Sequence, residues 1–205
     1  MTGGTALGRF YLKHRFSEYL DFFANEDPEF KRHIEFIRKS LNSGFSLKSE
    51  VTVFTNDFCR FFITEGEISL KIEFVNDVSA RVGIPVRYQF GLLDTPLNIL
   101  SNKITAILGR DEPKDIFDLV SLSHNFSFTW EAVFQIAKSK ALINEIDFSQ
   151  RIRSFPVNLL ASANWLMQPI QEEKFERYLK QIAGEVILGG ENSLGSGKPP
   201  ISLAK

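Results

Sequence analysis

Two short apolar segments of the sequence each carry one carboxylate. Asp21 lies in "YLDFF" (residues 19–23), and Glu73 lies in "LKIEF" (residues 70–74). A charge on a buried strand is costly unless it meets a cation or a ligand. Two strands that each offer one carboxylate suit Mg²⁺, which binds one or two carboxylates together with phosphate oxygens of a substrate. For Asp21 considered alone, an ion pair with a residue such as Arg15 is the commoner outcome.

Two glycines at the start of the chain suggest a contact with phosphate. Gly3 and Gly4 precede a predicted helix over residues 5–14, with Thr5 in a capping position. Glycine lets the backbone approach a phosphate closely, and a helix N-terminus adds free N–H groups and partial positive charge. A plain tight turn would produce the same residues.

A third charged segment is "SNKITAILGRDEPKDIFDL" (residues 101–119). Lys103 and Arg110 are seven residues apart, so they share one side of a helix, and Asp115 and Asp118 are three apart on the next. These charges either belong to the same site or form a solvated face.

The hydrophobic pattern predicts a mixed α+β half followed by a helical half. The first half is predicted to contain a strand at 19–23, a helix at 27–41, an antiparallel meander of "SEVTVFT", "RFFIT" and "SLKIEFV", and a short strand in "IPVRYQF". Helices are predicted at 97–109, 114–123, 129–141, 145–166 and 171–187. We therefore expect an α/β core over 1–95, a helical part over 96–188 packed on it, and a disordered, Gly/Ser/Pro-rich tail over 189–205.

Composition excludes several classes of protein. With 24 basic and 25 acidic residues among 205, the chain as a whole does not favour a polyanion, and its single cysteine, Cys59, excludes an internal disulfide. The sequence contains no apolar run of membrane-spanning length, so we expect a cytoplasmic protein without membrane contact. The histidines and Cys59 lack zinc spacing, and "GSGK" (195–198) lacks the remainder of a phosphate-binding loop.

Three segments together resemble the AbiEii/AbiGii toxin family, bacterial proteins of the polymerase-β-like nucleotidyltransferase superfamily. They are "GGTALGRFYLKHRFSEYLDFF", "LKIEF" and "LSNKITAILGRDEPKDIFDL", which occur in the family's order between residue 3 and about residue 122. The resemblance implies an α+β fold, in which a nucleotidyltransferase-like mixed β-sheet flanked by helices is followed by a C-terminal helical bundle. It also implies transfer of a nucleotide from an NTP to an RNA, such as tRNA, or to a protein, within a toxin–antitoxin or phage-defence system that includes a cognate antitoxin.

The resemblance also implies roles for single residues. Asp21, Glu73, Lys103 and Asp115 would be catalytic: Asp21 and Glu73 as ligands of Mg²⁺ or Mn²⁺, Lys103 at the triphosphate, and Asp115 beside the site. Gly3, Gly4 and Thr5 would contact phosphates, and Asp118 would support Asp115. Nucleotidyl transfer depends mainly on positioning and charge neutralisation, which residues of these types supply.

One position departs from the family pattern. Where the family has "SEDLDFF", this chain has "SEYLDFF", so Tyr19 occupies the place of the first carboxylate. A phenol keeps its proton at neutral pH and is a poor Mg²⁺ ligand. Glu18 replaces the lost ligand only if a bulge shifts the strand register. Similar proteins also have a segment before the glycines, so we expect a shortened chain or an incomplete start.

Two functions therefore compete. The first is a nucleotidyltransferase with a weakened one-metal site, and the second is a nonenzymatic relative that binds nucleotide or a partner protein without transfer. Tyr19 favours the second, whereas the other site residues favour the first. A local basic patch is either an RNA contact or a solvated face; its residues are Lys13, Arg15, Lys31, Arg32, Arg38 and Lys39.

Overall fold

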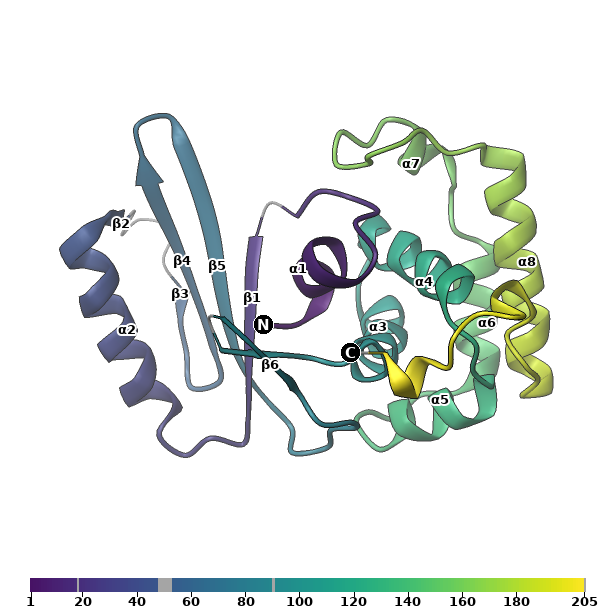
Figure 1. Ribbon diagram of the computed structural model, residues 1–205, viewed down its shortest axis with the longest axis horizontal. Helices are drawn as coiled ribbons and strands as arrows, with labels where there is room; N and C mark the ends of the chain where they lie inside the picture. The colour runs from purple at the N-terminus through teal and green to yellow at the C-terminus, as the bar shows by residue number, and fades with distance from the viewer. Residues whose placement is uncertain (18, 48–52, 90, 205) are drawn as a thin grey trace.

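The protein is built around a mixed β-sheet (Figure 1). The computed structural model describes residues 1–17, 19–47, 53–89 and 91–204. The sheet runs in the order β1-β5-β4-β2, with β3 also paired to β4. Strand β1 is parallel to β5, and the other pairs are antiparallel. The strands are β1 (Tyr19–Asn25), β2 (Ser46–Leu47), β3 (Val53–Phe54), β4 (Phe58–Glu65) and β5 (Ile68–Asp77). A separate hairpin pairs β6 (Val86–Tyr88) with β7 (Gly91–Leu93).

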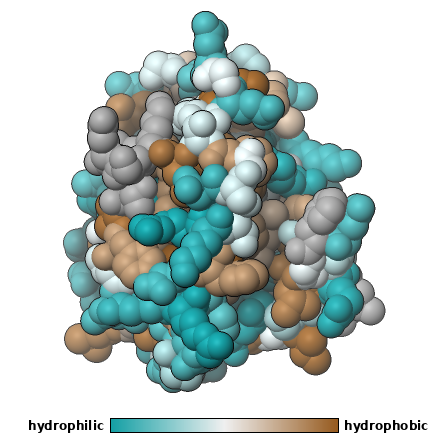
Figure 2. Space-filling view, turned by 90° about the vertical axis from the view of Figure 1, so that its left-hand side faces the viewer, coloured by the Kyte–Doolittle hydropathy of each residue, from teal (hydrophilic) through white to brown (hydrophobic). Residues whose placement is uncertain are grey.

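One helix covers one face of the sheet. Helix α2 (Phe30–Gly44) buries Phe30 and Ile34 against Cys59 and Phe61 of β4. Strand side chains alternate between faces, so these apolar residues share one side and leave the polar residues of β1 and β5 on the other. The outer side of α2 is solvent-exposed, and Figure 2 shows hydrophobic and hydrophilic residues interspersed on that side of the molecule.

The other face of the sheet looks toward a helical layer (Figure 1). This layer has its own hydrophobic core, in which Trp130, Phe134 and Phe148 are fully buried. Its helices are α3 (Pro96–Gly109), α4 (Pro113–Asn125), α5 (Trp130–Lys138), α6 (Glu145–Arg153), α7 (Asn158–Ala161) and α8 (Glu172–Leu188). Within the described part of the chain, no helix has the length and apolar character needed to cross a bilayer.

The predicted fold class is confirmed, since a mixed sheet is flanked by helices and followed by a helical bundle. The described parts of the predicted meander form the antiparallel strands β3, β4 and β5. The division at residue 95 remains a prediction. The helical core does not follow it, because Ala6 and Leu7 from the N-terminal segment are fully buried in that core.

The N-terminal helices differ from their predicted bounds. The first begins at Gly3, as α1 (Gly3–Ala6), and continues as a π-helical segment, η1 (Leu7–Tyr11), that ends before residue 14. Thr5 does not cap it, because the Thr5 hydroxyl bonds to β1 and the loop before it. Helix α2 begins at Phe30 and extends through Gly44, beyond the predicted end at Leu41.

The single helix predicted over residues 145–166 is wrong. Helix α6 ends at Arg153, and α7 is a separate turn of four residues. Pro156 lies between them, and proline removes a helical hydrogen bond and disfavours helical conformation in the residue before it. The apolar periodicity alone does not reveal this break.

The tail predicted to be disordered from Gly189 is instead ordered through residue 204 in the structure. It forms two 3₁₀ turns, η3 (Ser193–Gly195) and η4 (Ile201–Leu203). The buried Asn192 donates to the carbonyl oxygens of Ser123 (2.7 Å) and Phe126 (2.8 Å). Gly195 packs so closely that a Cβ atom there would lie 1.9 Å from the Phe126 carbonyl oxygen. Small residues therefore permit close packing here.

Some predictions concern residues outside the described part. Glu18, weighed above as a replacement ligand, is one of them, as are residues 49–52 of "SEVTVFT" and Phe90 of "IPVRYQF".

Candidate active site

A cleft of about 510 Å³ separates the polar face of the sheet from α1, α3 and α4. Its volume lies in the range of small-molecule sites. Acidic and basic side chains both line it. Among the described residues the acidic ones are Asp21, Glu73, Asp77, Glu112 and Asp115. The basic ones are Arg15, Lys71, Lys103, Arg110, Lys114 and Lys140. Such a density of cations suits a polyanionic ligand.

Asp21 and Glu73 are directly paired in the parallel register of β1 and β5. Residues paired in register point to the same face, so both carboxylates line the cleft. Burial, followed by the negative charge of Glu73, raises the pKa of Asp21 above its ordinary value. Asp21 Oδ2 accepts a 3.2 Å hydrogen bond from the Thr5 hydroxyl. The pair is thus short of positive charge on its Asp21 side.

Two cations contact Glu73 from neighbouring positions. Arg60 Nε on β4 lies 2.7 Å from Glu73 Oε1, and Lys71 Nζ lies 3.1 Å from the same oxygen. Lys71 also sits over the ring of Tyr19, with Nζ 3.5 Å from the ring centroid. The residue in the place of the first carboxylate therefore holds a lysine by a cation–π contact.

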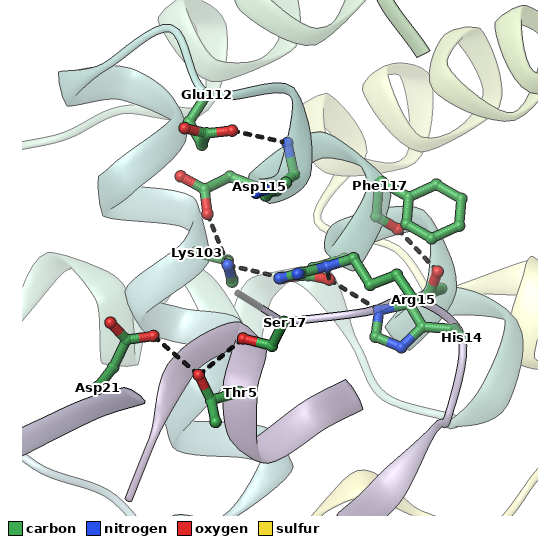
Figure 3. Close-up of polar contacts among 12 residues, drawn as sticks. Thr5, His14, Arg15, Ser17, Asp21, Lys103, Glu112, Asp115 and Phe117 are labelled. Atoms are coloured by element: carbon green, nitrogen blue, oxygen red, sulfur yellow. Dashed lines mark hydrogen bonds and ion pairs between the residues drawn. The ribbon is translucent and has the colours of Figure 1, made fainter. Parts of the chain in front are cut away.

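Lys103 joins a buried ionic cluster between α3 and α4 (Figure 3). Its Nζ lies 2.5 Å from Asp115 Oδ1 and 2.7 Å from Asp118 Oδ2. Burial alone would lower the pKa of Lys103, but the two carboxylates outweigh it and raise that pKa. Burial would raise the pKa of Asp115 and Asp118, yet Lys103 and the neighbouring cations hold both below the ordinary value.

Further cations complete this cluster. Arg15 binds Asp118 through Nε (2.7 Å) and Nη2 (2.8 Å), and His14 Nε2 lies 2.7 Å from Asp118 Oδ1. Arg110 grips Asp115 through Nε at 2.7 Å and Nη2 at 3.1 Å. Bidentate arginine–carboxylate pairs are strong and directional. Because Arg15 pairs with Asp118, it is not the partner of Asp21.

Gly4 makes room for Arg15, and Gly3 supplies a left-handed backbone conformation beside Asp21. A Cβ atom on Gly4 would lie 1.8 Å from Arg15 Nη2, so any larger residue would displace the guanidinium from its present position. Gly3 has a φ of +62°, and a Cβ atom there would lie 3.5 Å from Asp21 Oδ2. Thr5 is fully buried, and its hydroxyl contacts Ser17 Oγ (2.9 Å) and donates to the Tyr19 carbonyl oxygen (2.8 Å) (Figure 3).

The structure brings most of the predicted site residues to one cleft. They are Gly3, Gly4, Asp21, Glu73, Lys103 and Asp115, whereas Thr5 lies beneath the cleft surface. The alternative of a solvated charged face over residues 101–119 is wrong for its central members, since Lys103, Asp115 and Asp118 are buried. Arg15 is also buried, which removes it from the predicted basic patch.

The sequence assigns no role in the site to Arg60, Lys71 or Lys140. Lys71 is two residues before Glu73, so strand alternation places both on the same face, but it does not indicate a contact with a ligand. Lys140 Nζ donates 2.6 Å bonds to Asn98 Oδ1, Ser101 Oγ and Asn102 Oδ1, and burial lowers its pKa to about 8. No sequence motif indicates that contact.

Comparison with known families decides the relationship. The model of the AbiEii family, described as nucleotidyl transferase AbiEii toxin of a type IV toxin–antitoxin system, matches residues 1–193. The chain belongs to the AbiEii family. The predicted resemblance is thereby confirmed, and the protein is an AbiEii-family nucleotidyltransferase homologue.

Solved structures support the fold of this AbiEii-family protein. A candidate nucleotidyltransferase from H. pylori superposes with a TM-score of 0.58 at 19% sequence identity, covering 90% of this chain and 84% of that one. JHP933 from Helicobacter pylori gives a TM-score of 0.56 at 20% identity, covering 90% and 82%. A comparison with curated proteins gives no match.

Proposed function

We propose that this AbiEii-family protein transfers a nucleotide from a nucleoside triphosphate to an RNA, such as tRNA, or to a protein acceptor. The observation that carries the proposal is the register pairing of Asp21 with Glu73 at the wall of a cleft that six basic side chains line. Two facing carboxylates suit a divalent cation, and the surrounding cations suit a triphosphate. Nucleotidyl transfer needs both a divalent cation and a site that binds the triphosphate.

The donor set fits one Mg²⁺ or Mn²⁺ ion. Among the described residues, no group of three or more His, Cys, Asp or Glu side chains is arranged to hold a metal. Mg²⁺ is commonly held by one or two carboxylates, with phosphate oxygens and water as its other ligands. Asp21 and Glu73 would hold the ion in this way. When bound, it would neutralise charge on the phosphate oxygens during in-line attack at the α-phosphorus.

The other residues position charge around the ligand. Lys103 lies between Asp115 and the Asp21 side of the cleft. Burial and Glu73 raise the pKa of Asp21, and the positive charge of Lys103 partly opposes that rise. Asp115, fixed by Arg110, keeps the Lys103 ammonium in place. Gly3 and Gly4 line the same cleft and would let the phosphates approach the backbone.

A nonenzymatic role is the second candidate, and one contact favours it. Tyr19 holds the ammonium of Lys71 on the cleft face, where a carboxylate would hold a metal ion. A protein of this kind would bind nucleotide or its partner without transfer. Under either candidate, we propose that the chain works in the bacterial cytoplasm, in a toxin–antitoxin or phage-defence system, with a cognate antitoxin as its partner.

Transfer of label separates the two candidates. The protein is incubated with each α-³²P-labelled NTP, with Mg²⁺ or Mn²⁺, and with total RNA, and label is followed in RNA and in the protein. We expect labelling that falls at least about 100-fold in Asp21→Asn, because removing one transition-state charge contact costs 10²- to 10³-fold. Asp111→Asn, on an exposed carboxylate outside the cleft, is the matched control and should label normally.

Two outcomes oppose the enzymatic proposal. If neither RNA nor protein is labelled while equilibrium dialysis detects bound NTP, the nonenzymatic role is favoured. Labelling that appears only in Tyr19→Asp would indicate that the fold is intact and that tyrosine at position 19, in place of a carboxylate, prevents transfer in the wild type.

A further inference from the structure

Lys71 occupies an unusual place in the cleft. It pairs with Tyr19 in the register of β5 and β1, and its side chain is only 17% exposed. Its ammonium lies between the Tyr19 ring, at 3.5 Å from the centroid, and Glu73 Oε1, at 3.1 Å. The Tyr19 ring and the Glu73 carboxylate therefore fix a cation on the same face of the sheet as Asp21.

Two cations already compensate the negative charge of Glu73. Arg60 Nε and Lys71 Nζ both contact Oε1, at 2.7 Å and 3.1 Å. Among the described residues, Glu73 Oε2 and Asp21 Oδ1 have no hydrogen-bond partner, so each can still offer one oxygen to a ligand. A second divalent cation would meet the fixed ammonium of Lys71 at short range, and like charges repel strongly in a partly buried cleft.

We propose that the Lys71 ammonium, held by Tyr19 and Glu73, is a resident cation that contacts the triphosphate directly, so that the cleft binds nucleotide with a single divalent ion. This inference rests on the proposed nucleotide site and specifies which positive charges contact the triphosphate. Tyr19 contributes to this arrangement. Its phenol is a poor metal ligand, but the face of its ring positions the Lys71 ammonium. Lys71 is thus a further ligand-contacting residue.

Counting bound Mn²⁺ tests the inference without requiring turnover. Electron paramagnetic resonance measures Mn²⁺ bound per protein in the presence of an α,β-methylene nucleoside triphosphate, and calorimetry measures nucleotide affinity. We expect one Mn²⁺ per bound nucleotide in the wild type. Lys71→Met should weaken nucleotide binding by about 10- to 100-fold, the range of one charge-assisted hydrogen bond.

Three variants complete the experiment. Lys71→Arg keeps a cation over Tyr19 and should retain most of the affinity. Tyr19→Asp combined with Lys71→Met supplies a carboxylate and removes the ammonium, so its count should rise to two Mn²⁺. Lys180→Met, an exposed lysine on α8 outside the cleft, is the control and should match the wild type. Circular dichroism verifies that each variant is folded.

The outcomes separate this inference from the proposed function. Two Mn²⁺ ions in the wild type, or unchanged affinity in folded Lys71→Met, would overturn the resident cation and leave the nucleotide site standing. Absence of nucleotide binding in the wild type would overturn both.

Discussion

Two pairs of carboxylates in this protein have opposite environments. Asp115 and Asp118 on α4 are surrounded by Lys103 and Arg15, and their pKa values are lowered. Asp21 on β1 has Glu73 as its register partner, and its pKa is raised by burial and by that negative charge. Burial is therefore not what distinguishes them, because Asp118 is the more buried residue and yet the more acidic. The fixed cations that contact each carboxylate determine the direction of its pKa shift.

This difference assigns the pairs different tasks. A buried carboxylate that is fully paired with cations is needed by the fold, because its removal would leave those cations buried without a counter-charge, and it has little capacity left for a ligand. A carboxylate whose charge is uncompensated costs stability and gains from binding a cation, which is a common property of functional sites. The helix pair thus holds the cleft in shape. On the strands, Arg60 and Lys71 already contact Glu73, so Asp21 is the carboxylate that can still gain from binding a cation.

The largest expected effect comes from breaking the helix pair. Asp118→Asn leaves Arg15 and Lys103 buried with less negative charge, and such losses cost about 3–5 kcal/mol of unfolding free energy. Urea denaturation at pH 7 measures it. Since the pKa of Asp118 is lowered in the folded state, this stabilisation is complete above the ordinary value of 3.8 and declines only as the pH falls below it.

The exposed Asp111 provides the comparison for that variant. It pairs with Arg151 at the surface, so Asp111→Asn should change stability by less than about 1 kcal/mol. If the two variants lose the same amount, the buried cluster has no special structural role.

A smaller effect is expected from Gly4→Ala. The added methyl group would meet Arg15 Nη2, and the guanidinium would have to move away from Asp118. Overpacking of this kind costs about 1–3 kcal/mol, measured by thermal or urea unfolding. Gly44→Ala at the end of α2 is the control, because nothing lies within 4 Å of its Cβ position and the change should be neutral or stabilising. Equal responses would argue against a tight Gly4–Arg15 contact.

The smallest effect has the opposite sign. The raised pKa of Asp21 means that the folded state binds more protons than the unfolded chain above pH 3.8, so wild-type stability falls as the pH rises through this window. Asp21→Asn cannot ionise, so with a chelator present it should be more stable than the wild type at pH 7. That gain should disappear below pH 3.8. Urea unfolding at pH 3.5 and pH 7 measures both, and a destabilised variant at pH 7 would place Asp21 among the structural carboxylates.

Much of the fold was predictable because it depends on local patterns. Alternation gave β1 and β5, and helical periodicity with proline and glycine boundaries gave α3. The predicted limits of ordered segments were wrong where tertiary packing overrides local composition. The polar tail is ordered because Asn192 satisfies two carbonyl oxygens near the end of α4, a contact that no local pattern encodes.

The sequence by itself determined the family, the fold class and the residue types around the cleft, since motifs and hydrophobic periods are local properties of the chain. Only the tertiary structure decided which charges meet. It paired Asp21 with Glu73, gave Arg15 to Asp118, and set Lys71 over Tyr19. Electrostatic energy depends on distance and burial, and both are fixed only when strands and helices distant in sequence pack together.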